Sequence, residues 1–168
     1  TLLTLQSALP KPLTATALDQ GLTHVSWRGR LQNLEQGPLV DLLPAGWELW
    51  LDGGHNDSGG QVLAEQAKTW AEQDGKQLHL VMGMLNTKDP REFLKYLGPH
   101  AASMHAIAIP GQPLSLSADD LAKVAPRANS VLSVETALSA IITGSPVPGR
   151  ILITGSLYLA GHILTTNA

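Results

Sequence analysis

Short apolar segments typical of strands alternate with helix-like segments about five times along this sequence, and this order constrains the fold more than any other feature. Residues 47–51, 78–82, 104–109 and 150–154 are short apolar runs, and residues 130–134 form a weaker one. Strands that are joined through helices run parallel, with right-handed crossovers, and both faces of their sheet are covered. The order therefore predicts an α/β domain with a mainly parallel sheet between two layers of helices.

Typical start and stop residues support the helices between these strands. We expect helices at residues 14–20, 63–71, 89–97, 117–124, 135–143 and 157–164. Gly21, Gly75 and Gly144 follow three of them and are typical terminators, because glycine adopts the left-handed conformation without strain. Asp89 followed by Pro90 is a typical start, with a capping side chain and a proline in the first turn.

Composition excludes several classes of protein. With 43% hydrophobic and 15% charged residues, the chain has a globular composition, and its length of 168 residues suits one domain. A net charge of −3 lacks the basic excess that nucleic acid attracts, so we expect no nucleic acid partner. No apolar run reaches the roughly 18 residues of a membrane span, so no membrane partner is expected either. The absence of cysteine excludes disulfides and thiolate metal sites and suits a reducing cytoplasm, where we place the protein.

Residues 1–26 do not show the alternation of strand-like and helix-like segments that the remainder of the chain shows. Pro10 and Pro12 interrupt any helix there, because each proline disfavours helical conformation in the residue before it. The chain begins at Thr1, with no initiator methionine and no legible signal peptide. We interpret this segment as a linker or the end of another unit, and Thr1 as a position inside a longer protein.

The most informative motif is the glycine-rich turn at residues 52–60, which follows the strand at 47–51 and opens a helix. Its four glycines let a ligand approach the backbone, and the free N–H groups at a helix start favour an anion. Asp52 at the strand end could take the two hydroxyls of a ribose, and His55 could donate a hydrogen bond to a carboxylate or phosphate. The alternative is a tight turn in which one of residues 56–58 merely caps the helix.

Two other segments carry candidate side chains. Ser156 follows the last strand at the start of the last helix, so it would lie near the same edge of the sheet as Asp52. Its alternative role is to cap that helix. Arg28 and Arg30 stand where residues 1–26 join the domain. They could reach a phosphate shared with another domain, or they could belong to a solvated basic turn.

Several catalytic and metal-binding motifs are absent. The sequence has no phosphate-cradling Gly-x-x-x-x-Gly-Lys-Ser/Thr, no Gly-x-Gly-x-x-Gly after a strand and no Gly-x-Ser-x-Gly. The chain would therefore not hold a triphosphate alone, and a serine hydrolase would lack its usual motif. The six histidines lack the spacing of metal ligands, so we expect no metal site in this domain. His79, His100 and His105 are expected at the solvated surface.

Four motifs stand in a specific order along the chain. They are Trp27-Arg28-Gly29-Arg30-Leu31-Gln32, Leu51-Asp52-Gly53-Gly54-His55-Asn56, Val81-Met82-Gly83-Met84-Leu85 with Lys88-Asp89, and Gly155-Ser156-Leu157-Tyr158-Leu159-Ala160-Gly161. Together, from about Gly21 to Gly161, they resemble the C-terminal domain of the Mur ligase superfamily, and within it that of bifunctional dihydrofolate synthase and folylpolyglutamate synthase. The resemblance implies a Rossmann-like three-layer domain at residues 27–168, with a mainly parallel sheet of about six strands. Residues 1–26 would be an interdomain linker and the end of a preceding ATPase domain.

The resemblance also implies ATP-dependent amide ligation. A carboxyl group of folate or dihydropteroate would take the γ-phosphoryl group of ATP, and the amino group of L-glutamate would attack the acyl phosphate. ATP and Mg²⁺ would be held mostly by the preceding P-loop ATPase domain, so the chain by itself would be inactive. The site residues would be Arg30 at the transferred phosphate, Asp52 at the adenosine ribose, and His55, Ser156 and Tyr158 at the glutamate. Lys88 and Asp89 match a family motif without an assigned role.

The sequence departs from the family pattern at three positions. Arg28 stands where proline is usual, which would loosen the turn before Arg30, while Gly54 replaces the commoner alanine and Asp57 the commoner proline. Two alternatives stay open: another amino acid ligase of the Mur type, or a nucleotide-sensing or interaction module that kept the fold without the reaction. The resemblance does not choose between addition of the first glutamate to dihydropteroate, extension of polyglutamate on tetrahydrofolate, or both.

Overall fold

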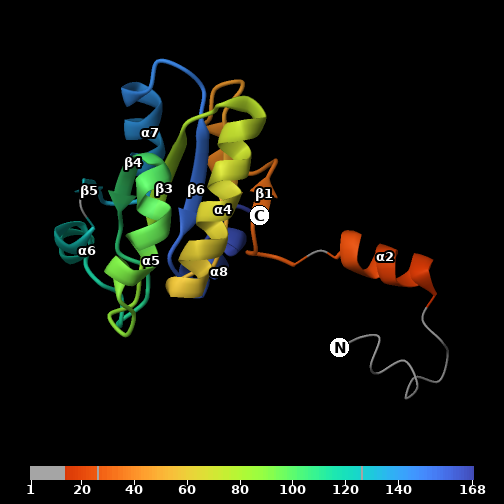
Figure 1. The fold of residues 1–168 in the computed structure, drawn as a ribbon. Coiled ribbons are helices and arrows are strands. Elements are labelled where there is room, and N and C mark those ends of the chain that lie inside the picture. The colour runs from red at the N-terminus through yellow and green to blue at the C-terminus, as the bar shows by residue number, and fades with distance from the viewer. Residues whose placement is uncertain (1–13, 26, 126) are drawn as a thin grey trace.

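The structure is a computed structural model that describes residues 14–25, 27–125 and 127–168. Its centre is a six-stranded sheet in the order β1-β2-β6-β3-β4-β5 (Figure 1). β1 runs antiparallel to β2, and all the other neighbouring strands are parallel. The expected α/β fold with a mainly parallel sheet is therefore confirmed. The strands are β1 (Gln32–Leu34), β2 (Glu48–Leu51), β3 (Leu78–Met82), β4 (Ala101–Ala106), β5 (Ala128–Ser130) and β6 (Arg150–Thr154).

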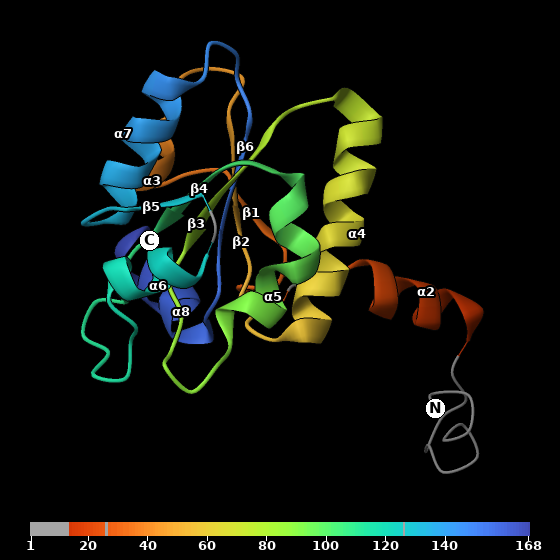
Figure 2. The ribbon, with the colours of Figure 1, turned by 60° about the vertical axis from the view of Figure 1, so that its left-hand side comes forward.

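Helices cover both faces of the sheet, as Figure 2 shows. α3 (Pro38–Asp41), α7 (Val134–Gly144) and α8 (Leu157–Thr166) pack on one face, and α4 (Asp57–Asp74), α5 (Pro90–Leu97) and α6 (Ala118–Val124) pack on the other. The short 3-10 helix η2 (Gly98–His100) leads from α5 into β4. Of the helices in the described part of the chain, none combines the length and the hydrophobicity that a membrane crossing requires.

The two faces of the central strands contribute to two separate cores. Every residue of β3 and β6 is buried, which is expected for parallel strands that are covered on both faces. Val81 of β3 packs in the core beside α7 and α8, while Leu80 and Met82 pack in the core beside α4 and α5. Phe93 of α5 is fully buried in this second core. The two cores hold the ends of adjacent strands in a fixed arrangement.

β4 lies earlier in the chain than the apolar pattern predicted. It begins at Ala101 rather than at residue 104, and it ends at Ala106. Ile107 and Ile109 beyond its end are buried as well. The expected strand was therefore displaced, because an apolar pattern marks burial and does not mark where a strand ends.

β5 is also displaced, and two short elements were not expected. β5 covers Ala128–Ser130 rather than residues 130–134, because Ser133 caps α7, which begins at Val134. β1 and α3 have three and four residues, too few for hydrophobic periodicity to reveal them. The differences are thus confined to short elements and to strand ends.

α2 (Ala15–Thr23) has no buried residue and stands apart from the sheet in Figure 1. The expectation that Gly21 ends this helix is wrong, since the helix continues through it to Thr23. A short helix with no buried residue gains little stability from packing. Residues 1–13 and residue 26, which belong to the expected linker, lie outside the described residues.

A network of ion pairs holds the amino end of the sheet together. Arg150 at the start of β6 is 5% exposed, and it donates from Nε to Glu48 at 2.7 Å and from Nη2 to Asp74 at 2.9 Å. Its guanidinium carbon lies 4.7 Å from the ring centroid of Trp70. Burial tends to raise the pKa of Glu48, but hydrogen bonds from Arg150 and Lys76 lower it to about 2. The network joins β2, β6 and α4 at the edge opposite to the carboxyl ends of the parallel strands.

Two histidines are buried in the sheet, so the expectation that they lie at the surface is wrong. His79 of β3 is 3% exposed and His105 of β4 is 5% exposed. Nδ1 of His79 lies 2.9 Å from the hydroxyl oxygen of Ser103. Within the described residues, Nε2 of His79 and Nδ1 of His105 have no hydrogen-bond partner. Burial lowers the pKa of both rings, and the neighbouring His105 lowers that of His79 further.

We expect the free energy of unfolding to decrease as the pH is lowered from about 7.5 to about 5.5. The folded pKa of each buried ring lies below its ordinary value of 6.5, so the unfolded chain binds protons more tightly and stability is lost below that pH. Each ring contributes at most about 1.4 kcal/mol per pH unit. Denaturant titrations at stepped pH, on the unaltered chain and on a His79→Gln/His105→Gln variant, measure the slope. We expect a shallower slope in the variant, and equal slopes would contradict the prediction.

Candidate functional site

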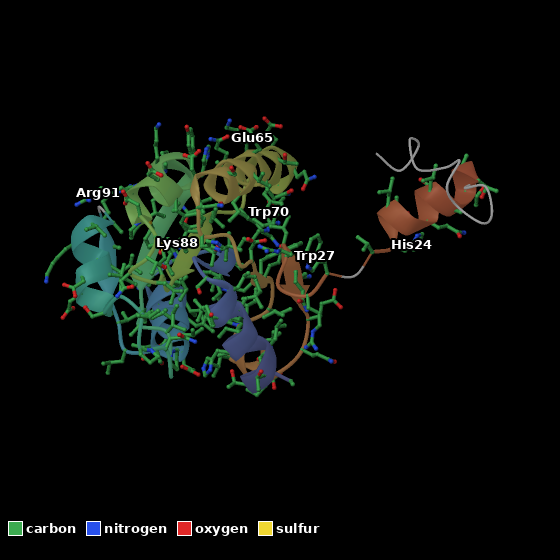
Figure 3. The ribbon with its side chains drawn as sticks, turned by 90° about the horizontal axis from the view of Figure 1, so that it is seen from below. His24, Trp27, Glu65, Trp70, Lys88 and Arg91 are labelled. Atoms are coloured by element: carbon green, nitrogen blue, oxygen red, sulfur yellow. The ribbon has the colours of Figure 1, made fainter. Side chains whose placement is uncertain are left out.

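The turns that follow β2, β6 and β3 meet at one edge of the sheet, and Figure 3 is a view onto this edge. The Gly155 N–H donates to the Gly54 carbonyl at 3.0 Å, and the Gly83 N–H donates to the Thr154 carbonyl at 3.2 Å. Adjacent parallel strands end at the same edge, and these bonds draw their turns together. We call the edge formed by residues 52–56, 83–88 and 154–158 the carboxyl rim.

Glycines permit the close approach of these turns. Gly155 has φ +103°, and a Cβ there would lie 2.8 Å from the Gly83 carbonyl oxygen. A Cβ on Gly53 would overlap the side chain of Leu157 in the first turn of α8. A larger residue at position 53 or 155 would therefore force the turns apart. These glycines are needed to assemble the carboxyl rim and not only to admit a ligand.

The Asp52 carboxylate lies beneath the carboxyl rim and is bonded to the backbone. The residue is 8% exposed. Its Oδ1 accepts from the Gly54 N–H at 2.6 Å, and its Oδ2 accepts from the Leu31 N–H at 2.7 Å. A Cβ on Gly54 would lie 2.8 Å from Oδ1, so the glycine that replaces the commoner alanine leaves room for the carboxylate. Asp52 thus joins the turn after β2 to the segment before β1.

The segment that carries Arg30 is held against this turn. The Gly53 N–H donates to the Gly29 carbonyl at 2.8 Å, beside the bond from Leu31 to Asp52. We call these two bonds the Asp52 latch. Leu31 has φ +42°, a conformation that costs a non-glycine residue about 1–3 kcal/mol and persists only where its surroundings maintain it. The position of Arg30 relative to the carboxyl rim therefore depends on Asp52.

Arg30 and Trp27 present a cation and an indole ring to solvent. Arg30 is exposed, and its Cζ lies 5.7 Å from the ring centroid of Trp27, within the range of a cation–π contact. Trp27 is 69% exposed, and Figure 3 shows it on the side from which the chain leads to α2. In the described part of the chain, Arg30 forms no salt bridge. Its guanidinium is therefore free to bind an anion.

His55 is half-buried on the turn after β2. Its Nδ1 lies 2.9 Å from the Gly53 carbonyl oxygen. Because a carbonyl oxygen only accepts, Nδ1 carries the hydrogen of this bond. Nε2 is then the acceptor in the neutral ring and a second donor in the protonated ring, which lets His55 bind a carboxylate or phosphate.

Ser156 is the N-cap of α8, so its capping role is confirmed. The residue is 3% exposed, and its Oγ accepts from the Tyr158 N–H at 3.1 Å. The hydroxyl hydrogen remains to be donated to another group. Tyr158, on the first turn of α8, is 57% exposed. The start of α8 thus offers a hydroxyl donor, a phenol and backbone N–H groups.

The structure brings the five candidate site residues to one side of the sheet. Asp52 and His55 follow β2, and Ser156 and Tyr158 follow β6, which is the neighbouring parallel strand. Arg30 joins them through the Asp52 latch. Residues that are as many as 128 positions apart in the sequence therefore lie at the same edge, because parallel strands end at one edge.

Lys88 and Asp89 lie on the loop after β3. Asp89 is the N-cap of α5, and its Oδ1 accepts from the Arg91 N–H at 2.9 Å. Lys88 is exposed, and in the view of Figure 3 it lies between Trp27 and Arg91. Among residues 14–25, 27–125 and 127–168, no three His, Asp or Glu side chains gather as ligands for a metal ion.

Sequence reasoning missed the Asp52 latch. Gly29, with φ +69°, stands between two arginines, and a glycine at such a place is a signal of a left-handed turn. The bond between Leu31 and Asp52 joins residues 21 positions apart, and no local pattern indicates it. Both partners lay within the quoted motifs, but the motifs alone did not show that they are bonded.

Comparison with known proteins identifies relatives that are similar in sequence. A search against models of protein families finds no match. The folylpolyglutamate synthase of Lacticaseibacillus casei is 30% identical over 155 residues, which are 92% of this chain and 33% of that protein. The dihydrofolate synthase/folylpolyglutamate synthase of Bacillus subtilis (strain 168) is 28% identical over 149 residues, which are 88% of this chain and 32% of that protein.

A solved structure shares the fold. The bifunctional folylpolyglutamate synthase/dihydrofolate synthase of Yersinia pestis, in complex with AMPPNP and a Mn ion, has a TM-score of 0.74 and 25% identity, and the match covers 93% of this chain and 35% of that one. The chain spans about a third of the length of the relatives that it matches. Over nearly all of its length, this chain is therefore homologous to a part of the folylpolyglutamate and dihydrofolate synthases.

Proposed function

We propose that this chain is the C-terminal domain of an ATP-dependent ligase that adds glutamate to dihydropteroate, to tetrahydrofolate or to both. The observation that carries the proposal is the carboxyl rim, on which the candidate phosphate-binding and amino acid-binding residues share one side of the sheet. Sequence similarity to folylpolyglutamate synthase over 92% of the chain supports the same class of reaction. Residues 27–168 would form the domain, and residues 1–26 would connect it to a preceding P-loop ATPase domain.

The proposed reaction joins a carboxyl group to an amino group. When bound, ATP with Mg²⁺ supplies the γ-phosphoryl group, which converts the folate carboxylate into an acyl phosphate and leaves ADP. The amino nitrogen of L-glutamate then attacks the acyl carbon, an amide bond forms, and inorganic phosphate and a proton leave. Negative charge spreads over the phosphoryl oxygens in both steps. Positioning and cationic side chains, rather than a protein nucleophile, therefore account for the rate.

Arg30 would stabilise the charge on the transferred phosphoryl group, since a guanidinium can donate two parallel hydrogen bonds to phosphate oxygens. Asp52 would act in two ways. It maintains the Asp52 latch, and the lone pairs that Gly54 and Leu31 do not use would accept hydrogen bonds from the ribose hydroxyls of ATP. Because Asp52 is 8% exposed, the ribose would reach only one edge of the carboxylate.

The incoming glutamate would bind between the turn after β2 and the start of α8. His55 would donate from Nε2 to a glutamate carboxylate, and Ser156 would donate its hydroxyl hydrogen. The first N–H groups of α8, a helix of 10 residues, favour an anion at the same place. Tyr158 is exposed on that first turn and would contact the glutamate from the solvent side.

The preceding domain would supply what this chain lacks. The sequence has no P-loop, so the triphosphate, the Mg²⁺ ligands and most of the folate pocket would belong to that domain. The relative from Yersinia pestis binds AMPPNP and a Mn ion, which supports the use of a nucleotide and a divalent cation by the complete protein. The absence of cysteine suits a reaction in the reducing cytoplasm.

An assay of ADP release by the complete protein tests the proposal. With ATP, Mg²⁺, L-glutamate and either dihydropteroate or tetrahydrofolate, we expect ADP release that requires the amino acid, and a product that is one glutamyl unit heavier. The chain alone is expected to release no ADP, and steady release from it would contradict the need for a preceding domain. Turnover with a peptidoglycan precursor in place of the folate would assign the protein to another ligase of the Mur type. If no acceptor supports ADP release, the proposed ligase activity is rejected.

A further inference from the structure

A groove between α5 and α6 runs along α5 from Arg91 to Pro99 and lies outside the proposed catalytic site. Its volume is about 580 Å³. The two helices that border it are neighbours at the β4–β5 end of the sheet (Figure 1). We call it the basic groove, because cationic side chains border an apolar floor. The floor is formed by Leu94, Pro99, Met104 and Val124, and the cations are Arg91, Lys95 and Arg127.

In the described part of the chain, no acidic side chain pairs with the cations of the basic groove. No acidic residue is among those that line it. Arg91 and Lys95 are exposed, and within the described residues neither forms a salt bridge. Arg127 donates from Nη2 to the Gly98 carbonyl at 3.4 Å and retains its other donors. Cations above an apolar floor favour an occupant that carries both carboxylates and hydrocarbon.

The basic groove continues to the carboxyl rim. A second groove of about 590 Å³ shares Arg91 and Val124 with it and reaches Lys88 on the loop after β3. Figure 3 shows Lys88 and Arg91 on the face that carries the carboxyl rim. A chain that extends from a ligand at the rim would therefore meet Lys88, Arg91 and Lys95 in turn.

The carboxylates in the second groove do not oppose an anionic occupant strongly. Asp89 is engaged as the N-cap of α5. Asp120 accepts from the Ser117 hydroxyl at 2.7 Å and from Lys123 Nζ at 2.9 Å. Both negative charges thus have local partners, and the cations Lys88 and Arg91 remain for a ligand.

The spacing of the cations matches a γ-linked glutamate chain. Arg91 and Lys95 are four residues apart on α5, which separates them by about 6 Å along the helix axis. A γ-glutamyl unit contributes five backbone bonds, or about 6 Å when extended, and carries one α-carboxylate. Five bonds turn successive carboxylates of a fully extended chain to opposite sides, so a rotation within each unit would bring successive carboxylates to the cations on α5. The two methylene groups of each unit would lie on the apolar floor.

We infer that the basic groove binds the γ-linked polyglutamate tail of the folate substrate. This inference deepens the proposed function and rests on it, because a folate that is extended by such a ligase carries this tail. Carboxylates of the tail pair with Arg91 and Lys95, and its hydrocarbon contacts Leu94 and Val124. The terminal γ-carboxylate of the tail stays at the site of amide formation, while units that were added in earlier rounds lie along α5, so longer tails gain additional contacts.

Binding of γ-linked hexaglutamate to the chain tests this inference without a catalytic step. Fluorescence anisotropy with a labelled peptide should show saturable binding that weakens as salt is added. The Arg91→Gln/Lys95→Gln variant should weaken the binding about fivefold, because two exposed ion pairs are lost. The matched variant Arg28→Gln/Lys68→Gln removes the same charge elsewhere and should change the Kd by less than about twofold.

An α-linked hexaglutamate is the charge-matched control ligand. Its methylene groups belong to side chains, and its peptide groups recur every ~3.5 Å, so polar backbone would be placed against the apolar floor. We expect it to bind at least about fivefold more weakly than the γ-linked peptide. Equal binding of the two peptides, or equal losses in the two double variants, would show attraction by charge alone and overturn the inference.

The peptide-binding measurement and the ligase assay test different claims, so either claim can be rejected while the other stands. If the complete protein releases ADP with a folate but the γ-linked peptide does not bind, the inference about the groove is overturned and the proposed function stands. If the peptide binds in the expected order while no acceptor supports ADP release, the groove is supported as a site for γ-glutamyl chains and the proposed reaction is rejected.

Discussion

The Arg30→Ala variant of the complete ligase is expected to lose about 10²–10³-fold in kcat, with a smaller change in the KM for the folate. The guanidinium is exposed beside Trp27 and would contact the phosphoryl oxygens most strongly when charge develops on them. Its removal therefore acts on the transition state more than on binding. Steady-state kinetics with saturating ATP and glutamate measure the effect.

Two variants control this prediction. Arg28→Ala removes a neighbouring exposed arginine that is outside the Asp52 latch, and it should leave kcat within about twofold. Arg30→Lys keeps the charge but loses the paired donors of the guanidinium, so its kcat should lie between those of the alanine variant and the unaltered enzyme. If Arg30→Ala retains the full kcat, Arg30 does not contact the transferred phosphate.

The Asp52→Ala variant is expected to lose both stability and turnover. Two short hydrogen bonds disappear, and the N–H groups of Leu31 and Gly54 lose their acceptor. The free energy of unfolding should fall by about 3 kcal/mol, since each buried N–H left unpaired costs roughly 1–3 kcal/mol. Leu31, at φ +42°, then loses its own bond in the latch and is held only through the bond from Gly53 to Gly29, so the segment that carries Arg30 shifts. We expect kcat to fall by about 10²-fold as a result.

Hydrogen exchange separates loss of the Asp52 latch from general destabilisation. When only the latch opens, the amide hydrogen of Leu31 should exchange faster while a core amide such as that of Val81 keeps its protection. Chemical denaturation of the chain measures the global effect. Asp52→Asn keeps one side-chain oxygen as an acceptor and should be intermediate in both stability and kcat. Unchanged exchange at Leu31 in Asp52→Ala would show that the latch does not depend on the carboxylate.

The elements that sequence reasoning predicted best are those with strong local signals. β3 has the expected bounds, and α5 begins at Pro90 after its Asp89 cap and is followed by Gly98, as expected. Caps, prolines and glycines act on their own few residues, so their effect can be predicted without knowledge of the rest of the chain. The capping roles of Ser117 and Ser156 were accessible for the same reason.

The predictions that were wrong concern burial and pairing. His79 was expected at the surface because it alternates within a strand, and His105 because it flanks a turn. His105 lies within β4 instead, and helices cover both faces of this sheet and bury both rings. β5 was placed too late because Val131 and Leu132 continue an apolar run past the last paired residue, Ser130. A polar residue in a strand is exposed only if the face of the sheet on which it lies is exposed. The exposure of that face depends on which helices pack against it.

The candidate site was predicted as a set of residues near one edge of the sheet, without the bonds that hold them there. The motifs contain Asp52, His55 and Ser156, and the βα order placed them at strand ends. That β2 and β6 are neighbours depends on the strand order β1-β2-β6-β3-β4-β5, which the alternation of elements does not specify. We expected the turns after β2 and β6 to converge, but only the strand order of the sheet shows that these two strands are neighbours.

By itself, the sequence determined the α/β class, the well-capped helices and the residues available for chemistry, because periodicity and capping act over a few neighbouring positions. The tertiary structure decided that Leu31 is bonded to Asp52, that two histidines are buried, and that Arg91 and Lys95 border an apolar groove. Each of these features joins segments that are distant in the chain. They arise from the packing of helices and strands against one another, and no short stretch of sequence contains that information.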